Sequence, residues 1–200
     1  MPREGFMGLA CAAVLAGCGG GGQVADLPPP HFDRAAFGRL LDRPAAFDLP
    51  RGGSARYEGG FAADIREADI TPSGRIEGGL TLDLDFANAS TVLPVEGRLH
   101  DISGAFLGEA VAIDSLPLVP GQGRLALTRD GARRSGEVAA GFGAELPLAG
   151  ESRRLDITIE SPLRGRGGRV LAGEVSGTIL TAPYTDQPHV LTGQFHATTE

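Results

Sequence analysis

His100, Asp101 and Ser103 stand close together in the sequence, and they are the residue types of a nucleophilic catalytic triad. Consecutive residues of a strand point to opposite faces, so their order alone does not bring the three side chains together. The chain also has no G-x-S-x-G motif, which would present a nucleophilic serine at a strand-to-helix turn. The sequence therefore predicts no catalytic residues, and we expect that the protein is not an enzyme.

Asp83 and Asp85 are a second candidate pair, because they fall on the same face of a predicted strand. At the rise of an extended chain their Cα atoms would lie about 6.6 Å apart. Two carboxylates at this spacing could bind calcium or take part in glycoside hydrolysis. The other face of the same stretch carries Leu80, Leu82 and Leu84, which is the pattern of a half-buried strand. We therefore interpret Asp83 and Asp85 as the solvent-exposed side of that strand.

Metal and cofactor sites have no local signature in this chain. Four histidines occur, at His31, His100, His189 and His196. None of them belongs to an H-x-x-x-H or H-E-x-x-H motif, so we interpret them as solvated polar residues. The glycine groups at 19–22 and 165–168 lack the G-x-x-x-x-G-K-[ST] spacing that binds nucleotide phosphates. The sequence predicts no metal site and no cofactor.

The charge pattern bears on the class of partner. All 18 basic residues are arginine, and with 25 acidic residues the net charge is −7. This balance argues against a nucleic-acid partner, because such proteins need a basic face that displaces counterions from phosphates. Five arginines flank one predicted hairpin and could form a basic rim for an anionic glycolipid or partner: Arg153, Arg154, Arg164, Arg166 and Arg169. A solvated hairpin without a ligand is the alternative.

The N-terminus has the layout of an export signal. Arg3 is followed by an apolar stretch at 6–16, which is too short to span a bilayer as a helix. The residues Leu15-Ala16-Gly17-Cys18 that end this stretch resemble the lipobox of bacterial lipoproteins. The resemblance implies a signal peptide at 1–17, cleavage before Cys18 and acylation of its thiol. The following glycine points to the outer membrane. The alternative is that Cys18 is a small residue in an apolar helix.

The remaining chain is predicted to be a tether and one folded domain. The glycines and prolines of 18–30 cannot form a core and are typical of a flexible tether, whose function would be to hold the domain away from the membrane. Within 31–51, the spacing of Phe32, Ala36 and Leu40 predicts a short α-helix, which ends before Pro44 and is followed by a linker. No cysteine follows Cys18, so no disulfide or thiolate metal site is expected in the folded part.

Residues 52–200 read as short alternating runs separated by turn residues, which predicts an all-β domain. The nine candidate runs are 55–65, 75–86, 95–102, 104–114, 123–128, 135–146, 154–160, 168–180 and 190–198. Their close spacing leaves no room for crossover helices, so the pairing is expected to be antiparallel. Closing the meander removes its exposed edges. We predict an antiparallel up-and-down β-barrel of about eight strands; a β-sandwich is the alternative.

Three stretches carry a resemblance to a known family. The sequences ISGAFLGEA at 102–110, AAGFGAELPLAG at 139–150 and LTLDLDFANAS at 80–90 resemble the Gly-x-Phe-x-Gly pattern and preceding strand in the barrels of transferrin-binding protein B and its relatives. The resemblance covers 54–198, although the C-terminal LTGQFHATTE departs from the family signature. It implies a lipid-anchored envelope protein whose non-enzymatic barrel binds a partner protein or small-molecule ligand. A structural or assembly lipoprotein of the envelope is the alternative.

Overall fold

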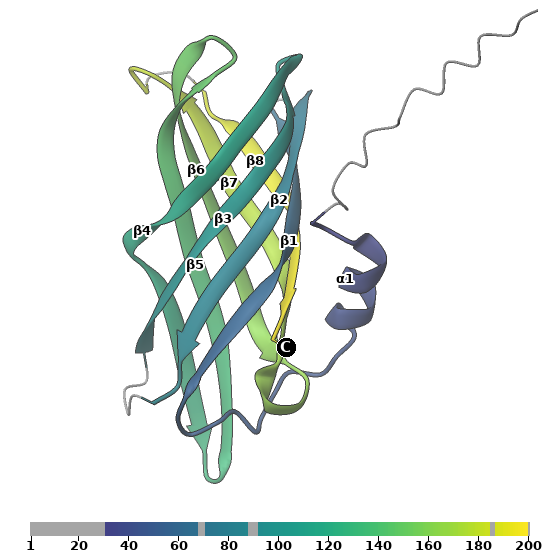
Figure 1. Cartoon of the computed structure of the whole chain (residues 1–200), viewed down its shortest axis with the longest axis vertical. Coiled ribbons are helices and arrows are strands. Elements are labelled where there is room, and N and C mark those ends of the chain that lie inside the picture. The colour runs from purple at the N-terminus through teal and green to yellow at the C-terminus, as the bar shows by residue number, and fades with distance from the viewer. Residues whose placement is uncertain (1–30, 68–70, 88–91, 185–186, 200) are drawn as a thin grey trace, which may run out of the picture.

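The computed structural model describes residues 31–67, 71–87, 92–184 and 187–199. It contains helix α1 (Arg34–Leu41), a short 3-10 helix η1 (Arg166–Gly168) and eight strands (Figure 1). The strands are β1 (Ser54–Arg66), β2 (Pro72–Asp85), β3 (Val92–Phe106), β4 (Glu109–Asp130), β5 (Arg133–Leu148), β6 (Glu151–Arg164), β7 (Val170–Thr181) and β8 (His189–Thr198). The signal peptide at 1–17, Cys18 and the tether at 18–30 lie outside the described residues.

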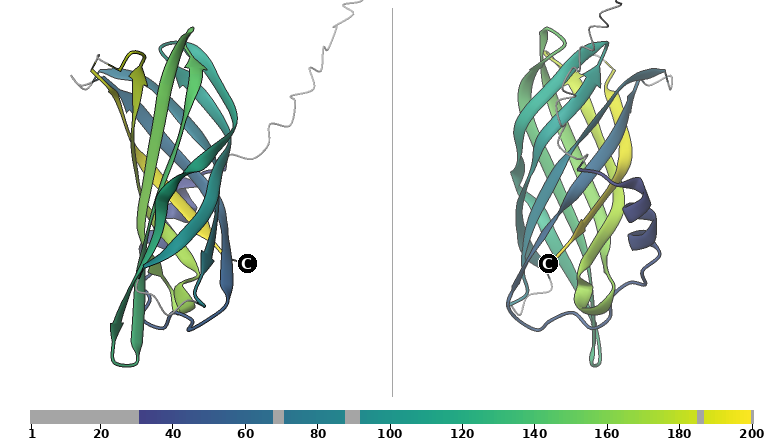
Figure 2. Two further views of the ribbon diagram at one scale, coloured as in Figure 1. Left: turned by 90° about the vertical axis from the view of Figure 1, so that its left-hand side faces the viewer. Right: turned by 45° about the vertical axis from the view of Figure 1, so that its right-hand side comes forward.

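The eight strands form one closed antiparallel barrel, which confirms the predicted architecture in place of a sandwich. Each strand pairs with the next along the chain, and β1 closes the ring by pairing with β8. At the seam Phe61 is paired with Phe195 and Ala63 with Gly193. Short connections between sequential strands favour this order, because a tight turn joins only antiparallel neighbours. The helix lies outside the ring, alongside β7 and β8 (Figures 1 and 2).

Nine predicted runs become eight strands because two boundaries were misplaced. The run 104–114 crosses the hairpin turn at Leu107 and Gly108, both of which have positive φ. A leucine in this conformation is uncommon, so its apolar side chain hides the turn in the sequence. The run 123–128 is the second half of β4, which continues through a register shift between Leu118 and Gly123. Pro117 lies just before that shift and Pro120 within it, and these prolines make β4 look like two separate strands.

The barrel interior is filled by apolar side chains from alternate positions of all eight strands. The largest of those that are fully buried are Tyr57, Phe61, Phe86, Phe106, Phe142, Phe195, Ile65, Leu80, Leu82, Leu84, Leu93 and Leu99. The intervening positions carry charged side chains outward; Arg75 Nη1, for example, donates to Asp64 Oδ1 at 3.0 Å. An eight-stranded barrel has an interior just wide enough for side chains to fill. The alternation of faces seen in the sequence therefore builds a packed core.

Helix α1 is short and is fixed at both ends by local chemistry. Asp33 caps its start, where Oδ1 accepts from the N–H groups of Ala35 and Ala36 at 2.8 and 3.0 Å. These bonds hold the pKa of the Asp33 carboxyl below its usual range. Phe37 packs with Phe32 in a small cluster on the outer wall of the barrel. No α-helix in the described part of the chain is long and apolar enough to cross a membrane.

A glycine allows the chain before α1 to lie directly on the barrel. The segment reaches β1 at Gly60, where a Cβ atom would lie 2.0 Å from the carbonyl oxygen of His31. Phe32 then packs with Ala62 and Ala172, small residues on the outer faces of β1 and β7. The glycine and these small side chains therefore form a shallow apolar surface on the outside of the barrel, against which the segment before α1 packs.

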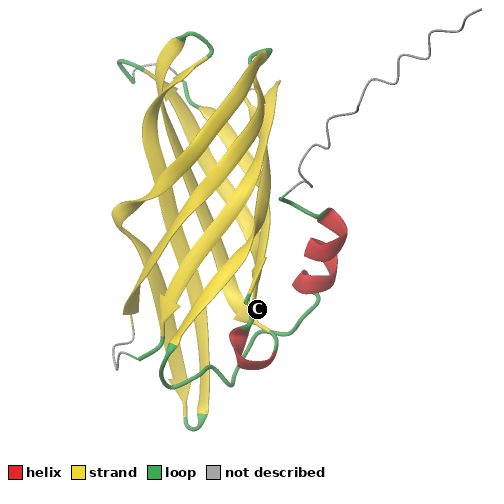
Figure 3. Cartoon of the chain, in the orientation of Figure 1, coloured by secondary structure: helices red, strands yellow, loops and turns green. Residues whose placement is uncertain are grey.

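Residues 44–53, the closing segment, run from α1 across one end of the barrel to β1 (Figure 3). The backbone of Ala45 bridges to Arg164 at the end of β6, and Asp48 bridges to Arg134 at the start of β5. Ala46 and Leu49 are buried and join the main core. The predicted linker therefore covers this end of the barrel with two apolar side chains.

Candidate functional site

The sequence argument that His100 and Asp101 point to opposite faces is wrong, because β3 carries a bulge there. The register of β2 and β3 shifts between Glu77 and Gly79, and Asp101 has a φ of 50°. The extra residue breaks the alternation of faces. Asp101 Oδ2 therefore lies 2.8 Å from His100 Nδ1. This bond is the main reason that the pKa of the Asp101 carboxyl is lowered.

The second partner of His100 is a threonine and not Ser103. His100 Nε2 lies 3.4 Å from Thr81 Oγ1, and Thr81 is 6% exposed. Gly79 leaves room for the imidazole, because a Cβ atom there would lie 2.2 Å from His100 Cε1. His31 completes the group with a T-shaped ring contact to His100 at 5.6 Å between centroids. The arrangement fixes the start of the described chain to β3.

His196 makes a separate contact with the same N-terminal segment. Its Nε2 accepts a hydrogen bond from the backbone N–H of Asp33 at 3.2 Å, and its ring lies 5.4 Å from that of Phe32. Burial lowers the pKa of His196, although the nearby Asp33 carboxylate opposes this effect. Among the described residues no group of three His, Cys, Asp or Glu side chains has a geometry that could hold a metal ion. The histidines that the structure brings together act as contacts for the segment preceding α1.

We expect the stability of the domain to fall as the pH is lowered from 7 to 5. Only the neutral ring of His196 accepts from Asp33, and its folded-state pKa lies below the unfolded value. The unfolded state therefore binds more protons, so stability is complete above about pH 6.5 and decreases below it. Thermal melting in matched buffers measures the loss, and His196→Gln, which keeps an acceptor but does not titrate, should reduce it. An equal loss in both proteins would contradict this assignment.

Asp83 and Asp85 have separate local partners, which agrees with their interpretation as a solvent-exposed face. Asp83 Oδ2 is 3.9 Å from Arg56 Nη1 on the neighbouring strand, and its side chain is 47% exposed. Asp85 Oδ1 accepts from the backbone N–H of Ala87 at 2.8 Å, which supports the turn after β2. The two carboxylates therefore stabilise a cross-strand pair and a turn.

The predicted basic rim of five arginines does not form. Arg153 and Arg154 stand at the start of β6, whereas Arg164 ends that strand and Arg166 and Arg169 follow it. The length of β6, about 14 residues at 3.4 Å each, separates the two groups. Two members are also occupied by other contacts: Arg153 binds Glu151 at 2.6 Å, and Arg164 Nη1 donates to the Leu41 carbonyl at 3.1 Å. The separation was not predicted from the sequence, because residues that flank one hairpin were assumed to lie close together.

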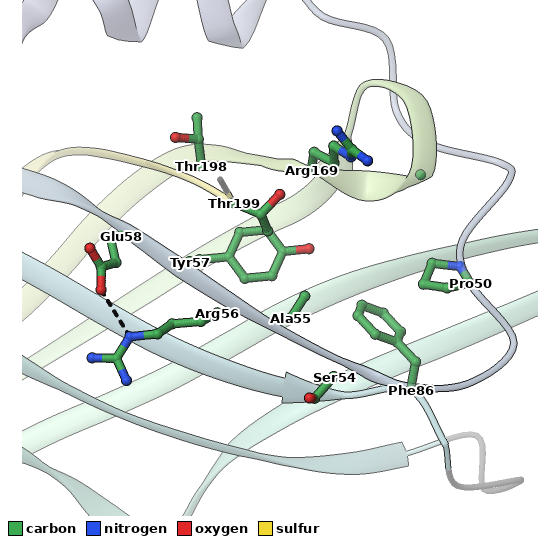
Figure 4. A pocket seen from close by; sticks show the side chains of 11 residues that line it. Pro50, Ser54, Ala55, Arg56, Tyr57, Glu58, Phe86, Arg169, Thr198 and Thr199 are labelled. Atoms are coloured by element: carbon green, nitrogen blue, oxygen red, sulfur yellow. Dashed lines mark hydrogen bonds and ion pairs between the residues drawn. The ribbon is translucent and has the colours of Figure 1, made fainter.

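One hollow lies at the end of the barrel that the closing segment covers. This end hollow has a volume of ≈ 490 Å³ and lies between the start of β1, the end of β8 and η1 (Figure 4). Its lining residues are Pro50, Ser54, Ala55, Arg56, Tyr57, Glu58, Phe86, Gly167, Arg169, Thr198 and Thr199. Residues from both ends of the domain sequence therefore meet there.

The end hollow has aromatic side chains at its base and charged side chains around its margin. Tyr57 and Phe86 are each 1% exposed, while Arg56 Nε donates to the exposed Glu58 Oε1 at 2.9 Å. The Tyr57 hydroxyl donates to the Gly168 carbonyl at 2.6 Å, and burial raises the pKa of this phenol. Tyr57 therefore stays protonated and ties η1 to β1, and Arg169 follows directly after η1. Sequence reasoning missed this site, because its residues come from four segments with no common motif.

Comparison with protein-family models, with curated proteins and with solved structures finds no match for this chain. The role of the barrel must therefore be argued from its own residues.

Proposed function

We propose that the protein is a lipid-anchored protein of a bacterial cell envelope whose barrel binds a partner without catalysing a reaction. Acylation of Cys18 would supply the anchor, and the glycine after it favours the outer membrane. The resemblance of three glycine-rich stretches to the transferrin-binding protein B barrels supports a binding role. An eight-stranded antiparallel barrel is compatible with that resemblance.

The observation that carries the proposal is that the barrel is filled inside and hollowed at its end. Apolar side chains such as Phe61, Leu82 and Phe195 occupy the interior, so we place the ligand on the outer surface. The end hollow offers a rigid apolar base, a charged margin and a volume of ≈ 490 Å³. Protein interfaces commonly combine a buried apolar centre with a polar rim. A side chain of a partner protein, or a small ligand, fits this description.

The proposed tether is long enough to let the barrel reach a partner near the membrane. The segment 18–30 would extend over about 40 Å if fully stretched, at about 3.3 Å per residue. Its glycines would give flexibility, and its three final prolines would stiffen the part next to the domain. The anchor would therefore restrict the barrel to the membrane surface while leaving its ends accessible.

We expect that a charge reversal in the end hollow weakens capture of the partner from native membranes. The full chain carrying Arg169→Glu is compared with the wild-type protein and with Arg66→Glu, a matched exposed arginine at the opposite end of β1. The wild-type and Arg66→Glu proteins should crosslink to a partner in equal amounts. Arg169→Glu should reduce the amount of crosslinked partner about tenfold, since reversing a rim charge weakens binding by on the order of 1.4 kcal/mol.

Two results would contradict the proposal. Equal capture by both variants would show that the end hollow is not the binding surface. Recovery of the chain as a fixed subunit of an envelope assembly, unaffected by Arg169→Glu, would favour the structural or assembly lipoprotein instead.

A further inference from the structure

A second hollow, the arginine pocket, lies beside the turn between β4 and β5. It has a volume of ≈ 390 Å³. Its lining consists of Arg51, Ala87, Arg129, Gly131, Ala132, Arg133 and Arg134. Four of these seven residues are arginines and none is acidic, in a protein whose net charge is −7. The pocket therefore gathers four of the 18 arginines of this acidic protein at one small site.

Arg134 is the central residue of the arginine pocket because it is buried without a counterion. It is 6% exposed, and its Nη1 donates to the carbonyl oxygen of Pro50. Among the described residues, its Nε and Nη2 have no hydrogen-bond partner. Burial and the positive charges of Arg129 and Arg51 lower the pKa of Arg134. A buried cation without a counterion destabilises a fold, so a compensating anion would stabilise it.

The nearby carboxylates do not supply that group. Asp48 Oδ1 accepts from the Gly167 N–H at 2.8 Å, and Asp85 is bonded to Ala87. Asp130 is the strand partner of Arg133, but no ion pair joins it to Arg133 or Arg134 in the described part of the chain.

The buried Arg153 shows how the charge of a buried arginine can be balanced by a carboxylate within this protein. Arg153 is also 6% exposed, but its Nη2 binds Glu151 Oε2 at 2.6 Å and its Nε binds Thr181. Its guanidinium carbon also lies 4.9 Å from the centre of the Phe106 ring. Arg153 is thus paired with a carboxylate, although its Nη1 also has no hydrogen-bond partner, whereas no ion pair involves Arg134 in the part of the chain that the structure describes.

We propose that the arginine pocket binds a phosphate monoester, either as a free phosphorylated molecule or as a lipid headgroup. The guanidinium fork matches two oxygens of a phosphate, and several arginines are favoured where a doubly charged anion is bound. Arg51 comes from the closing segment and Arg133 from the start of β5, where its guanidinium carbon lies 5.8 Å from the centre of the Phe47 ring. The anion would therefore link these two segments. This site is separate from the end hollow, so its failure leaves the proposed partner binding unaffected.

Inorganic phosphate is the first probe, used with the full chain carrying Cys18→Ala so that no acyl group is present. Phosphate should raise the melting temperature above that in sodium chloride of equal ionic strength. Arg51→Gln and Arg133→Gln, which are exposed positions, should each weaken phosphate binding about fivefold to tenfold in calorimetric titration. Arg134→Met should abolish binding. The control Arg66→Gln should leave it unchanged.

Vesicles distinguish the two sources of the phosphate monoester. Phosphatidylcholine vesicles containing phosphatidic acid are compared with vesicles that carry the same charge as oleate. If the protein binds only the vesicles that contain phosphatidic acid, and Arg51→Gln abolishes this binding, the ligand is a lipid headgroup. If the protein binds inorganic phosphate but neither kind of vesicle, the ligand is a free phosphorylated molecule. The proposal is overturned if phosphate stabilises no more than chloride, or if Arg66→Gln weakens phosphate binding as much as Arg51→Gln. If Arg134→Met does not fold, the two exposed variants decide the outcome.

Discussion

Leu82→Asp is expected to unfold the barrel. Leu82 is fully buried in the second half of β2, and its side chain belongs to the packed interior. An aspartate there would bury a carboxylate without a partner or would need to be protonated, and the leucine packing would also be lost. The combined cost is at least about 4 kcal/mol, a large share of the roughly 5–15 kcal/mol that stabilises an ordinary domain.

The matched control for this variant is the neighbouring residue on the other face. Asp83→Asn removes an exposed carboxylate whose contact with Arg56 is 3.9 Å long, so its effect should stay within about 0.5 kcal/mol. Urea denaturation followed by circular dichroism measures both free energies of unfolding. Similar values for the two variants would show that the faces of β2 are not as the structure places them.

Cys18→Ala is expected to move the whole protein from the membrane fraction to the soluble fraction. The proposed acyl groups would supply the affinity for the bilayer, because each buried methylene contributes about 0.8 kcal/mol. Cell fractionation with an antibody against the barrel measures the distribution. Cys11→Ala is the control, since it removes the other thiol but leaves the lipobox-like residues intact.

The result also tests the anchor independently of partner binding. Retention of the Cys18→Ala protein after a high-salt wash would contradict lipidation. Release of both cysteine variants would point to a general effect on export instead.

The strands could be predicted from the sequence where one face of the strand is buried and the other face is exposed to solvent. In β2 the leucines at 80, 82 and 84 alternate with Asp83 and Asp85, and this pattern alone predicted the strand and its inward face. Closure was predictable from the number and spacing of such runs. The sequence does not show which residues pair at the seam, because that register depends on the bulges and turns of all eight strands.

Local departures from alternation were not predictable. The bulge at Asp101 brings its carboxylate to His100, which no rule of alternating faces anticipates. The buried position of Leu49 likewise depends on a long-range contact, since it donates its N–H to Arg134, a residue far away in the sequence. A short apolar segment that has neither helical nor strand periodicity does not indicate which part of the fold it will pack against.

The arginine pocket had a signal that sequence analysis did not use. Arg134 falls in phase with Val138 and Ala140, whose side chains point into the barrel, whereas Arg133 is in the opposite phase. A charged residue in the inward phase of a strand is unusual and marks either an ion pair or a ligand site. The lining residues Arg51 and Arg129 could not be assigned to it, because they come from other segments.

The seam between β1 and β8 governs how the chain can fold. Phe61 and Phe195 are neighbours in the barrel but are separated by most of the polypeptide, so their pairing is an entropically costly loop closure that slows folding. Until β8 is added, β1 and β7 each present a row of unsatisfied backbone groups. While the domain folds, pairing of these edges with other chains therefore competes with closure of the barrel until β8 is in place.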